Sequence, residues 1–235
     1  MERLNDGWDQ LPTIVTTIPE LDTAADGAPK TVHYVGPIAE RAARSTWDPP
    51  WAPNDRRPLV LVSFSTTRLW DPASRIRNTL AALADEPVRI LAIAGVSSLP
   101  PEVPDNATVR PFVQHTDVLP SVSVTVTHCG HGTVTASLAH GVPIAGLPYP
   151  AADQPFLAGR VQALGAGIAL DGESSPAVIK KVVRDLLDRP SFREGAARLA
   201  KAIRLAPGAA GAADVLEELG RHKGHLSRPG QAKDY

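Results

Sequence analysis

A β-branched run that ends abruptly in a glycine-rich turn constrains the fold of this chain more than any other feature. Residues 122 to 127 read VSVTVT, an alternation typical of a β-strand, and residues 128 to 133 follow directly as HCGHGT. Val134 and Leu138 then recur at helical spacing, and Gly141 is placed to end the helix. We therefore expect a strand, a glycine-rich turn and a helix in this order.

This turn is suited to binding an anion. The first backbone N–H groups of a helix have no partners inside it and form its positive end, which favours phosphate. Gly130 and Gly132 would let an anion approach without a Cβ in its way. Spacing alone leaves a second interpretation open, in which Gly130-His131-Gly132 is only a tight connection.

Strands alternate with helices from residue 58 onward. The expected strands are residues 58 to 64, 88 to 94, 108 to 111, 122 to 127 and 144 to 147; beyond residue 154 only helices are expected. This alternation favours an α/β fold with a Rossmann-like parallel sheet and helices on both faces. Such sheets bind ligands at the carboxyl ends of their strands. Four loops should meet there, at residues 63 to 67, 113 to 115, 128 to 133 and 153 to 154.

The segment from His128 onward resembles the donor-sugar signature of GT-B type glycosyltransferases, which use nucleotide sugars and act on small molecules and antibiotics. The counterparts of that signature are His128, Gly130, Gly132, Thr133, Gly141-Val142-Pro143, Pro148, Asp153-Gln154 and Leu164-Gly165-Ala166-Gly167. Cys129 departs from the pattern, because the family usually has a glycine there, and its side chain is expected to narrow the approach to a diphosphate. The resemblance covers roughly residues 13 to 220.

The resemblance implies the C-terminal half of a GT-B fold and a UDP-sugar or dTDP-sugar as donor substrate, without a further cofactor. The residues implied for the diphosphate are His128, Gly130, His131, Gly132, Thr133, Ser65 and Thr66. Val113 and Gln114 would contact the nucleotide base largely through main-chain groups, and Asp153 and Gln154 would bind sugar hydroxyls. Histidine suits a departing diphosphate, because partial protonation near neutral pH can balance the charge.

Structural interpretations remain open for several of these residues. Asp153 could be a helix cap, His128 a strand-end histidine bound by backbone groups, and residues 63 to 67 an ordinary hydroxyl-rich turn. Without the resemblance, His115 would be interpreted as a surface loop histidine. A dinucleotide-binding domain is a further alternative, but Thr135 stands where the last glycine of that fingerprint belongs.

Charge and cysteine content argue against several classes of function. With 24 Lys and Arg against 25 Asp and Glu, no overall positive field favours nucleic acid or an anionic membrane. No apolar run approaches the roughly 20 residues of a transmembrane helix, and no signal-peptide core is present, which favours the cytoplasm. Because Cys129 is the only cysteine, neither an internal disulfide nor a cysteine-cluster metal site is expected.

Residues 1 to 55, broken by prolines, are expected to be an interdomain linker and the remnant of an N-terminal domain. Residues 56 to 222 would form the donor-binding domain, and residues 223 to 235 a frayed tail. In the resembling family a histidine of the N-terminal domain deprotonates the acceptor hydroxyl, and no counterpart is found here, so no catalytic residue is assigned. The chain is therefore expected to bind the donor but to transfer sugar poorly or not at all by itself.

Three origins would explain such a chain. It could be an excised domain, a natural truncation, or one subunit of a split enzyme whose partner polypeptide supplies the acceptor site in trans. A non-catalytic nucleotide-sugar-binding subunit or a relic is the alternative function.

Overall fold

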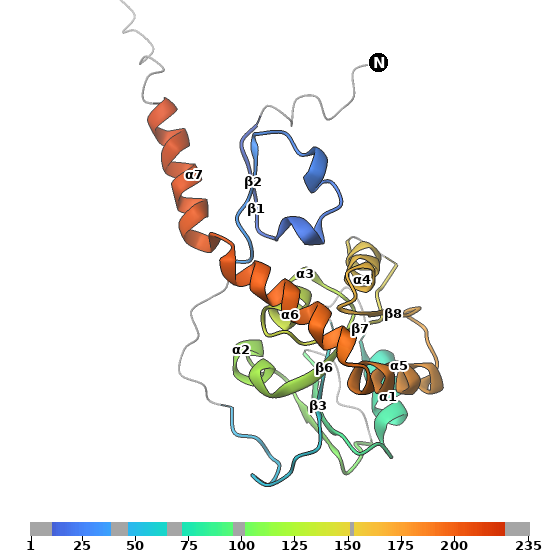
Figure 1. Cartoon of the computed structure of the whole chain (residues 1–235). Helices are drawn as coiled ribbons and strands as arrows, with labels where there is room; N and C mark the ends of the chain where they lie inside the picture. Colours follow the sequence, from blue (N-terminus) through green and yellow to red (C-terminus); the bar gives the residue numbers. More distant parts are fainter. Residues whose placement is uncertain (1–10, 39–46, 65–71, 96–101, 151–152, 224–235) are drawn as a thin grey trace, which may run out of the picture. The chain divides into compact units, whose positions relative to one another are not determined.

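The computed structural model of the protein describes residues 11–38, 47–64, 72–95, 102–150 and 153–223 (Figure 1). The chain divides into two compact units. Residues 41–204 form the larger unit, and residues 1–40 together with 205–235 form the smaller one. All of the residues expected to contact a donor belong to the larger unit.

A six-stranded sheet forms the centre of the larger unit. Its strands are β3 (Leu59–Ser63), β4 (Arg89–Ile93), β5 (Ala107–Arg110), β6 (Val122–Thr127), β7 (Ile144–Gly146) and β8 (Gly167–Ala169). All neighbouring strands are parallel, and their order is β5-β4-β3-β6-β7-β8. The chain builds one half of the sheet outward from β3, returns to the centre and builds the other half outward from β6. This reversal places a topological switch point between β3 and β6, which is where open parallel sheets bind their ligands.

Helices follow or precede these strands. They are α1 (Ala73–Leu83), α2 (His115–Val118), the short 3-10 helix η4 (Leu119–Ser121), α3 (His131–Ala139), α4 (Gln154–Ala163), α5 (Pro176–Asp188) and α6 (Pro190–Leu205). α3 directly follows the turn after β6, and α4 directly follows the loop after β7. The first turns of α3 and α4, like that of α1 after β3, therefore lie at the carboxyl edge of the sheet.

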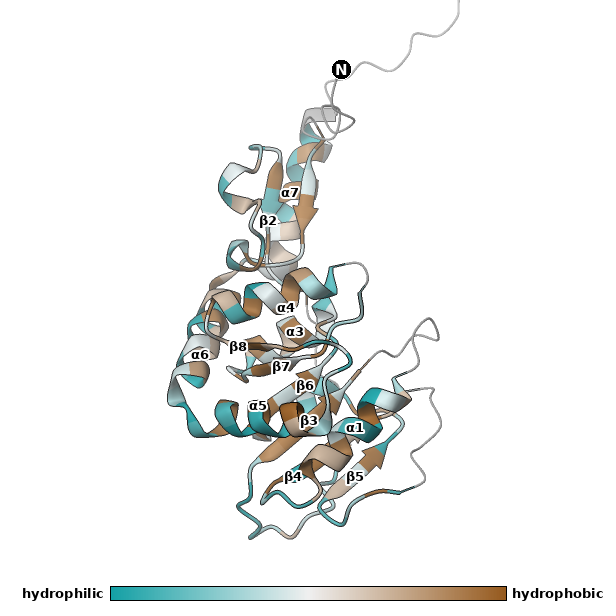
Figure 2. Cartoon of the chain, turned by 90° about the vertical axis from the view of Figure 1, so that its right-hand side faces the viewer, coloured by the Kyte–Doolittle hydropathy of each residue, from teal (hydrophilic) through white to brown (hydrophobic). Residues whose placement is uncertain are grey.

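Hydrophobic clusters cover both faces of the sheet. On one face, Val60 and Val62 of β3 pack with α1 and α5. On the other face, Leu59 and Leu61 pack with residues around the end of α2, beside the partly buried Trp47. Successive strand residues point to opposite faces, so a strand covered on both sides must be apolar throughout, as β3 is. Figure 2 shows these strands as mostly hydrophobic and the outer surface of α5 as hydrophilic.

The expected α/β fold class is confirmed, and the expected strands agree with the observed ones to within one or two residues. The expectation of helices alone beyond residue 154 is wrong, because β8 lies there. β8 contains only the residues Gly167–Ala169, too few for a periodic pattern to mark a strand. No helix in the described parts of the chain is long and apolar enough to cross a membrane.

The smaller unit holds a parallel pair of short strands. Its elements are β1 (Thr13–Val15), η2 (Pro19–Leu21), η3 (Ala25–Gly27), β2 (Val32–Tyr34) and α7 (Gly208–Lys223). The hydroxyl of Tyr34 donates to the Asp22 carboxylate at 2.6 Å, and burial together with this bond raises the pKa of Tyr34 to about 12. The N–H of Gly208 donates to the carbonyl of Val35, which ties the start of α7 to the end of β2.

Candidate functional site

His128 lies directly after β6, beside the carboxyl end of β3, because Ser63 and Thr127 are register partners in the sheet. The imidazole folds back over the turn, where a Cβ on Gly130 would come within 2.5 Å of Nε2. Glycine at position 130 therefore makes room for this ring position. Nδ1 of His128 and Oγ1 of Thr127 are buried and have no hydrogen-bond partner among the described residues. Buried polar atoms normally have partners, so such unpaired atoms favour a ligand or water at this place.

The environment of His128 favours the neutral ring. Burial lowers the pKa of His128, the positive charge of Arg75 lowers it further, and the Asp153 carboxylate acts in the opposite direction. In the free protein the imidazole is therefore neutral at neutral pH. A bound anion would reverse this balance, because it stabilises the protonated form.

The N-terminus of α3 is open. Gly130 is its N-cap, no side chain caps the helix, and the first bond along it runs from the N–H of Val134 to the carbonyl of Gly130. The N–H groups of the three residues between them make no hydrogen bond within the described chain. A Cβ on Gly132 would meet nothing within 4 Å, so free space lies against this turn. Open donors, a positive helix end and free space beside His128 can together accept an anion.

Cys129 occupies the turn without obstructing it. Its φ of 63° is left-handed, the conformation that glycine adopts most readily. The side chain is fully buried, and a Cβ on Gly146 in β7 would lie within 2.5 Å of its Sγ. The thiol points into the interior toward β7 and α4, so the expectation that it narrows the approach to a diphosphate is wrong. Burial also raises the pKa of Cys129 to about 12.

Asp153 and Gln154 lie at the start of α4 and differ in their surroundings. Asp153 is exposed and makes no capping hydrogen bond, so the structure gives no support to its interpretation as a helix cap. Gln154 is buried, and its Oε1 accepts a hydrogen bond of 3.0 Å from the N–H of Tyr149. The amide of Gln154 thus stabilises the loop that presents the Asp153 carboxylate.

The segment expected to hold the nucleotide base starts α2. Gln114 is the extended N-cap of α2, and Nε2 of His115 lies 3.1 Å from Oγ of Ser63, at the end of β3. The interpretation of His115 as a surface loop histidine is wrong, because His115 begins α2 and is partly buried, and burial lowers the pKa of His115. This contact fixes the segment to the carboxyl edge of the central strand.

A cavity of about 400 Å³ adjoins this segment. It is lined by Val113 and Gln114 together with Trp47, Asp48, Arg110, Phe112 and Asp117. Trp47 lies before β3 in the chain, and no sequence pattern places it near the expected base contacts. Ser65 and Thr66, the remaining residues expected at the diphosphate, lie outside the described residues.

Arg75 and Tyr149 are two further residues near His128 that sequence reasoning did not identify. The guanidinium carbon of Arg75, in the first turn of α1, lies 3.7 Å from the centroid of the Tyr149 ring. The Tyr149 and His128 rings are 5.9 Å apart and inclined by 52°. No local pattern marks this arrangement, because Arg75 has the sequence context of an ordinary helix face.

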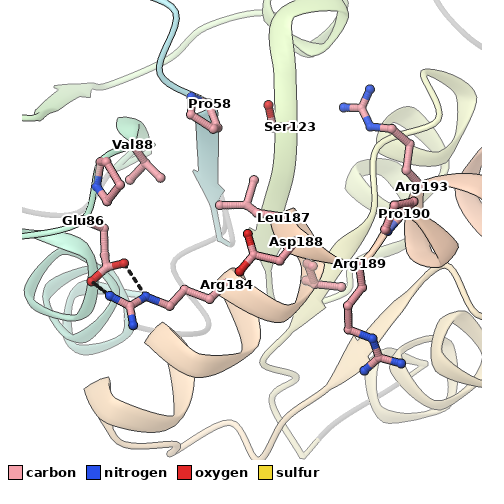
Figure 3. Close-up of a pocket in the computed structure, with 12 residues that line it drawn as sticks. Pro58, Glu86, Val88, Ser123, Arg184, Leu187, Asp188, Arg189, Pro190 and Arg193 are labelled. Carbon is pink, nitrogen blue, oxygen red and sulfur yellow. Dashed lines mark hydrogen bonds and ion pairs between the residues drawn. The ribbon is translucent and has the colours of Figure 1, made fainter.

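A larger cavity, of about 750 Å³, lies at the opposite edge of the sheet (Figure 3). It is lined by residues that precede the strands, such as Pro58 and Val88, and by the end of α5. Its buried carboxylate, Glu86, is already neutralised by ion pairs with Arg184 and Lys180. None of the expected donor contacts lines it, so we assign it no part in donor binding. The described residues also contain no group of three or more His, Cys, Asp or Glu side chains that could hold a metal ion.

Comparison with known proteins identifies a family whose matched region includes the turn at His128 and the start of α4. The model of the family described as Erythromycin biosynthesis protein CIII-like, C-terminal domain, matches residues 75–219. Demethyllactenocin mycarosyltransferase of Streptomyces fradiae is 37% identical over 193 residues, which cover 80% of this chain and 41% of that protein. The chain spans about half the length of the curated relatives it matches.

Solved structures agree with the fold. CalG4, the calicheamicin glycosyltransferase, superposes with a TM-score of 0.79 at 26% identity, covering 97% of this chain and 58% of its own. The glycosyltransferase VinC, solved in complex with dTDP, has a TM-score of 0.62 over 80% of this chain and 46% of its own, at 23% identity. The resemblance to GT-B glycosyltransferases is thereby confirmed. The chain belongs to the family of erythromycin biosynthesis protein CIII-like C-terminal domains, and it is a glycosyltransferase C-terminal domain of the antibiotic type.

Proposed function

We propose that the larger unit binds a UDP-sugar or dTDP-sugar as the donor for glycosyl transfer, at the carboxyl edge of the sheet between β3 and β6. The observation that carries this proposal is the unpaired, buried Nδ1 of His128 beside the open N-terminus of α3. Both features lie at the switch point of the sheet. VinC, which shares the fold, was solved in complex with dTDP, and this supports a nucleoside diphosphate as the ligand.

The turn after β6 and the start of α3 are proposed to bind the diphosphate of the donor. The diphosphate would accept hydrogen bonds from the N–H groups of His131, Gly132 and Thr133, and the ring of His128 would lie against it. Charge develops on the diphosphate as the glycosidic bond to it breaks, and a histidine that becomes protonated there stabilises this charge. Ser65 and Thr66 complete the proposed diphosphate contacts.

The two ends of the donor extend to neighbouring loops. Val113 and Gln114 would hold the base through main-chain groups, and this segment is fixed by the contact between His115 and Ser63. The exposed Asp153 carboxylate would accept hydrogen bonds from sugar hydroxyls, and Gln154 would contact the sugar beside it.

We infer further that transfer to an acceptor requires groups beyond this donor site. A general base must lie within hydrogen-bond reach of the acceptor hydroxyl, and we assign no described residue to that role. A second polypeptide or domain that carries the acceptor site would supply it. Steady formation of glycoside by the pure chain would contradict this part, and donor binding with no turnover in any pairing would favour the alternative of a non-catalytic binding subunit. The cytoplasm is the proposed location, on the sequence features given above.

Calorimetric titration of the full chain with UDP, dTDP and NAD tests donor binding. We expect a pyrimidine nucleoside diphosphate to bind and NAD not to bind. His128→Ala should weaken binding by about 1 to 3 kcal/mol, the usual cost of losing a charge-assisted contact. Preference for NAD would overturn the assignment, as would the absence of binding to UDP and dTDP by a folded chain.

Gly132→Ala separates binding from folding. No atom lies within 4 Å of the added Cβ, so the free protein should be unchanged or more stable by about 0.5 to 1 kcal/mol, the helix preference of alanine over glycine. A diphosphate against the turn would meet this methyl group, and affinity should fall at least about tenfold. Gly159→Ala, in the exposed middle of α4, is the matched control, since its Cβ also meets nothing and it should leave binding unchanged.

A further inference from the structure

We propose that Arg75 is a positioning residue of the donor site and acts on His128 through the ring of Tyr149. The inference rests on the proposed donor binding and goes beyond it, because it assigns a role to a residue of α1 that contacts neither end of the donor in that proposal.

Arg75 is a buried cation with a weak counter-charge. Its side chain is 6% exposed, while its ion-pair partner Glu173, at 3.0 Å, is 78% exposed. An exposed carboxylate contributes little to stabilising a buried charge, because water screens it. Nε of Arg75 also donates to the carbonyl of Gly172 at 2.9 Å, which fixes the plane of the guanidinium.

The fixed guanidinium plane determines the position of Tyr149. The ring of Tyr149 lies 3.7 Å from the Arg75 guanidinium carbon, a distance typical of a close cation–π contact. The same ring lies next to His128, and the N–H of Tyr149 donates to Gln154. Tyr149 therefore contacts residues proposed for the diphosphate end and for the sugar end of the donor.

Close packing makes this arrangement rigid. A Cβ on Gly172 would approach Nη2 of Arg75 to 2.5 Å and would clash with the carbonyl of Pro148. The first turn of α1, the loop after β7 and the segment before α5 thus meet at one point without spare room. Binding groups held by such a packed support keep their geometry before the ligand arrives.

Charge adds to the geometric effect. The groups whose charges act on the His128 ring are Arg75 from α1 and Asp153 from the start of α4, and Tyr149 and Glu173 lie around Arg75. Burial, and after it the charge of Arg75, lowers the pKa of His128 and favours the neutral ring in the free protein, and an incoming anion shifts the ring toward the protonated form. Donor binding should therefore be accompanied by proton uptake at His128.

Histidine NMR on the full chain, with His128→Asn to assign the signal, tests the proposal without any ligand. Arg75→Met should move the His128 signal, because Tyr149 loses its support, and should shift the titration of His128 to higher pH. Arg184→Met, which removes an arginine ion pair at the opposite edge of the sheet, should change neither. A wild-type His128 signal and titration in Arg75→Met would overturn the proposal, whether or not the chain binds a nucleotide.

Titration with dTDP-glucose gives the second readout, since this diester has no phosphate group that titrates near neutral pH. Arg75→Met should bind it about tenfold more weakly than wild type, with less proton uptake. Unchanged affinity in the variant would overturn the positioning role, whereas lack of binding by wild type would count against the proposed function itself. If Arg75→Met does not fold, Arg75→Lys, which keeps the charge but loses the planar fork, should show the moved signal and weaker binding. If Arg75→Lys has the wild-type His128 signal and the wild-type affinity for dTDP-glucose, the proposal is also overturned.

Discussion

The sulfur of Cys129 fills the space that a side chain at Gly146 would need. A Cβ on Gly146 would lie 2.5 Å from this sulfur and 3.4 Å from the Cβ of Ala158. The side chain of Cys129 therefore packs against Gly146 of β7, where only a glycine leaves room for it. This contact fixes the turn that carries His128 to the sheet.

Gly146→Ala should destabilise the protein by about 1 to 3 kcal/mol, the usual cost of overpacking a core. Cys129→Gly should change the free energy of unfolding little. Glycine removes the backbone strain of a side-chain residue at positive φ, and this gain offsets the loss of a buried sulfur. The double variant should regain most of the stability that Gly146→Ala loses, since the methyl then occupies the space left by the sulfur. Urea unfolding of the four proteins measures this coupling. Strictly additive effects would show that the two residues do not compete for space.

The thiol of Cys129 should be almost unreactive in the native protein. The side chain is fully buried, so a reagent cannot reach the sulfur. Burial also raises the pKa of the thiol to about 12, so almost none of it is in the reactive thiolate form at neutral pH. Labelling of the thiol with a disulfide reagent can be monitored by absorbance. The reaction should be slow in the native chain and rapid in urea. Saturating dTDP-glucose should slow it further if opening of the turn precedes reaction. Native labelling as fast as that of the unfolded chain would contradict the burial of this side chain.

Acid should destabilise the fold through His115 and His128. Burial lowers the pKa of both rings in the folded state, so the unfolded chain binds more protons once pH falls below about 6.5. The stability that the neutral rings contribute is present above that pH and is lost as pH falls toward the folded pKa values. Urea midpoints measured between about pH 7.5 and 5 should fall in wild type and fall less in His115→Asn/His128→Asn. Above about pH 7.5 the two curves should run parallel, and equal slopes throughout would contradict the assignment.

Local pattern was sufficient to predict most of the fold. The apolar run at β3 and the alternation in β6 are signals carried by neighbouring residues, and both strands lie where the sequence places them. The same holds for the turn at His128, where glycines followed by a helix can be recognised without tertiary information. Three-residue β8 has no such signal, because a strand this short contains no period to detect.

The support of the site could not be predicted, because it depends on contacts between distant parts of the chain. The contact of Ser63 with His115 joins residues 52 positions apart. Arg75 and Tyr149 come from separate elements, and neither is marked by its own neighbours in sequence. For Cys129, the sequence shows a side chain in place of a glycine but not the direction in which it points. That direction is decided by the space above Gly146, which exists only in the folded sheet.

Glu86 offers a test of how the opposite edge of the sheet is held together. Its carboxylate is 5% exposed and accepts hydrogen bonds from Nε and Nη2 of Arg184 at 2.6 and 2.8 Å (Figure 3). It also forms an ion pair with Lys180 at 2.8 Å. These contacts, those with Arg184 first, lower the pKa of Glu86. The two cations are 57% and 36% exposed, so water can hydrate them but cannot hydrate Glu86 as well.

Removal of the cations should therefore cost more than removal of the anion. Lys180→Met/Arg184→Met leaves the Glu86 carboxylate without a partner and should destabilise the protein more at pH 7 than Glu86→Gln does. The stability contributed by Glu86 is present above the ordinary pKa of a glutamate and is lost as pH falls through its lowered folded pKa. The deficit of the double variant should accordingly shrink as urea unfolding is repeated toward about pH 4. Lys181→Met, which removes only an exposed ion pair with Asp185 on the same helix, should change stability by less than about 0.5 kcal/mol at either pH. A deficit that stays constant with pH would show that lost packing, and not the uncompensated charge of Glu86, causes it.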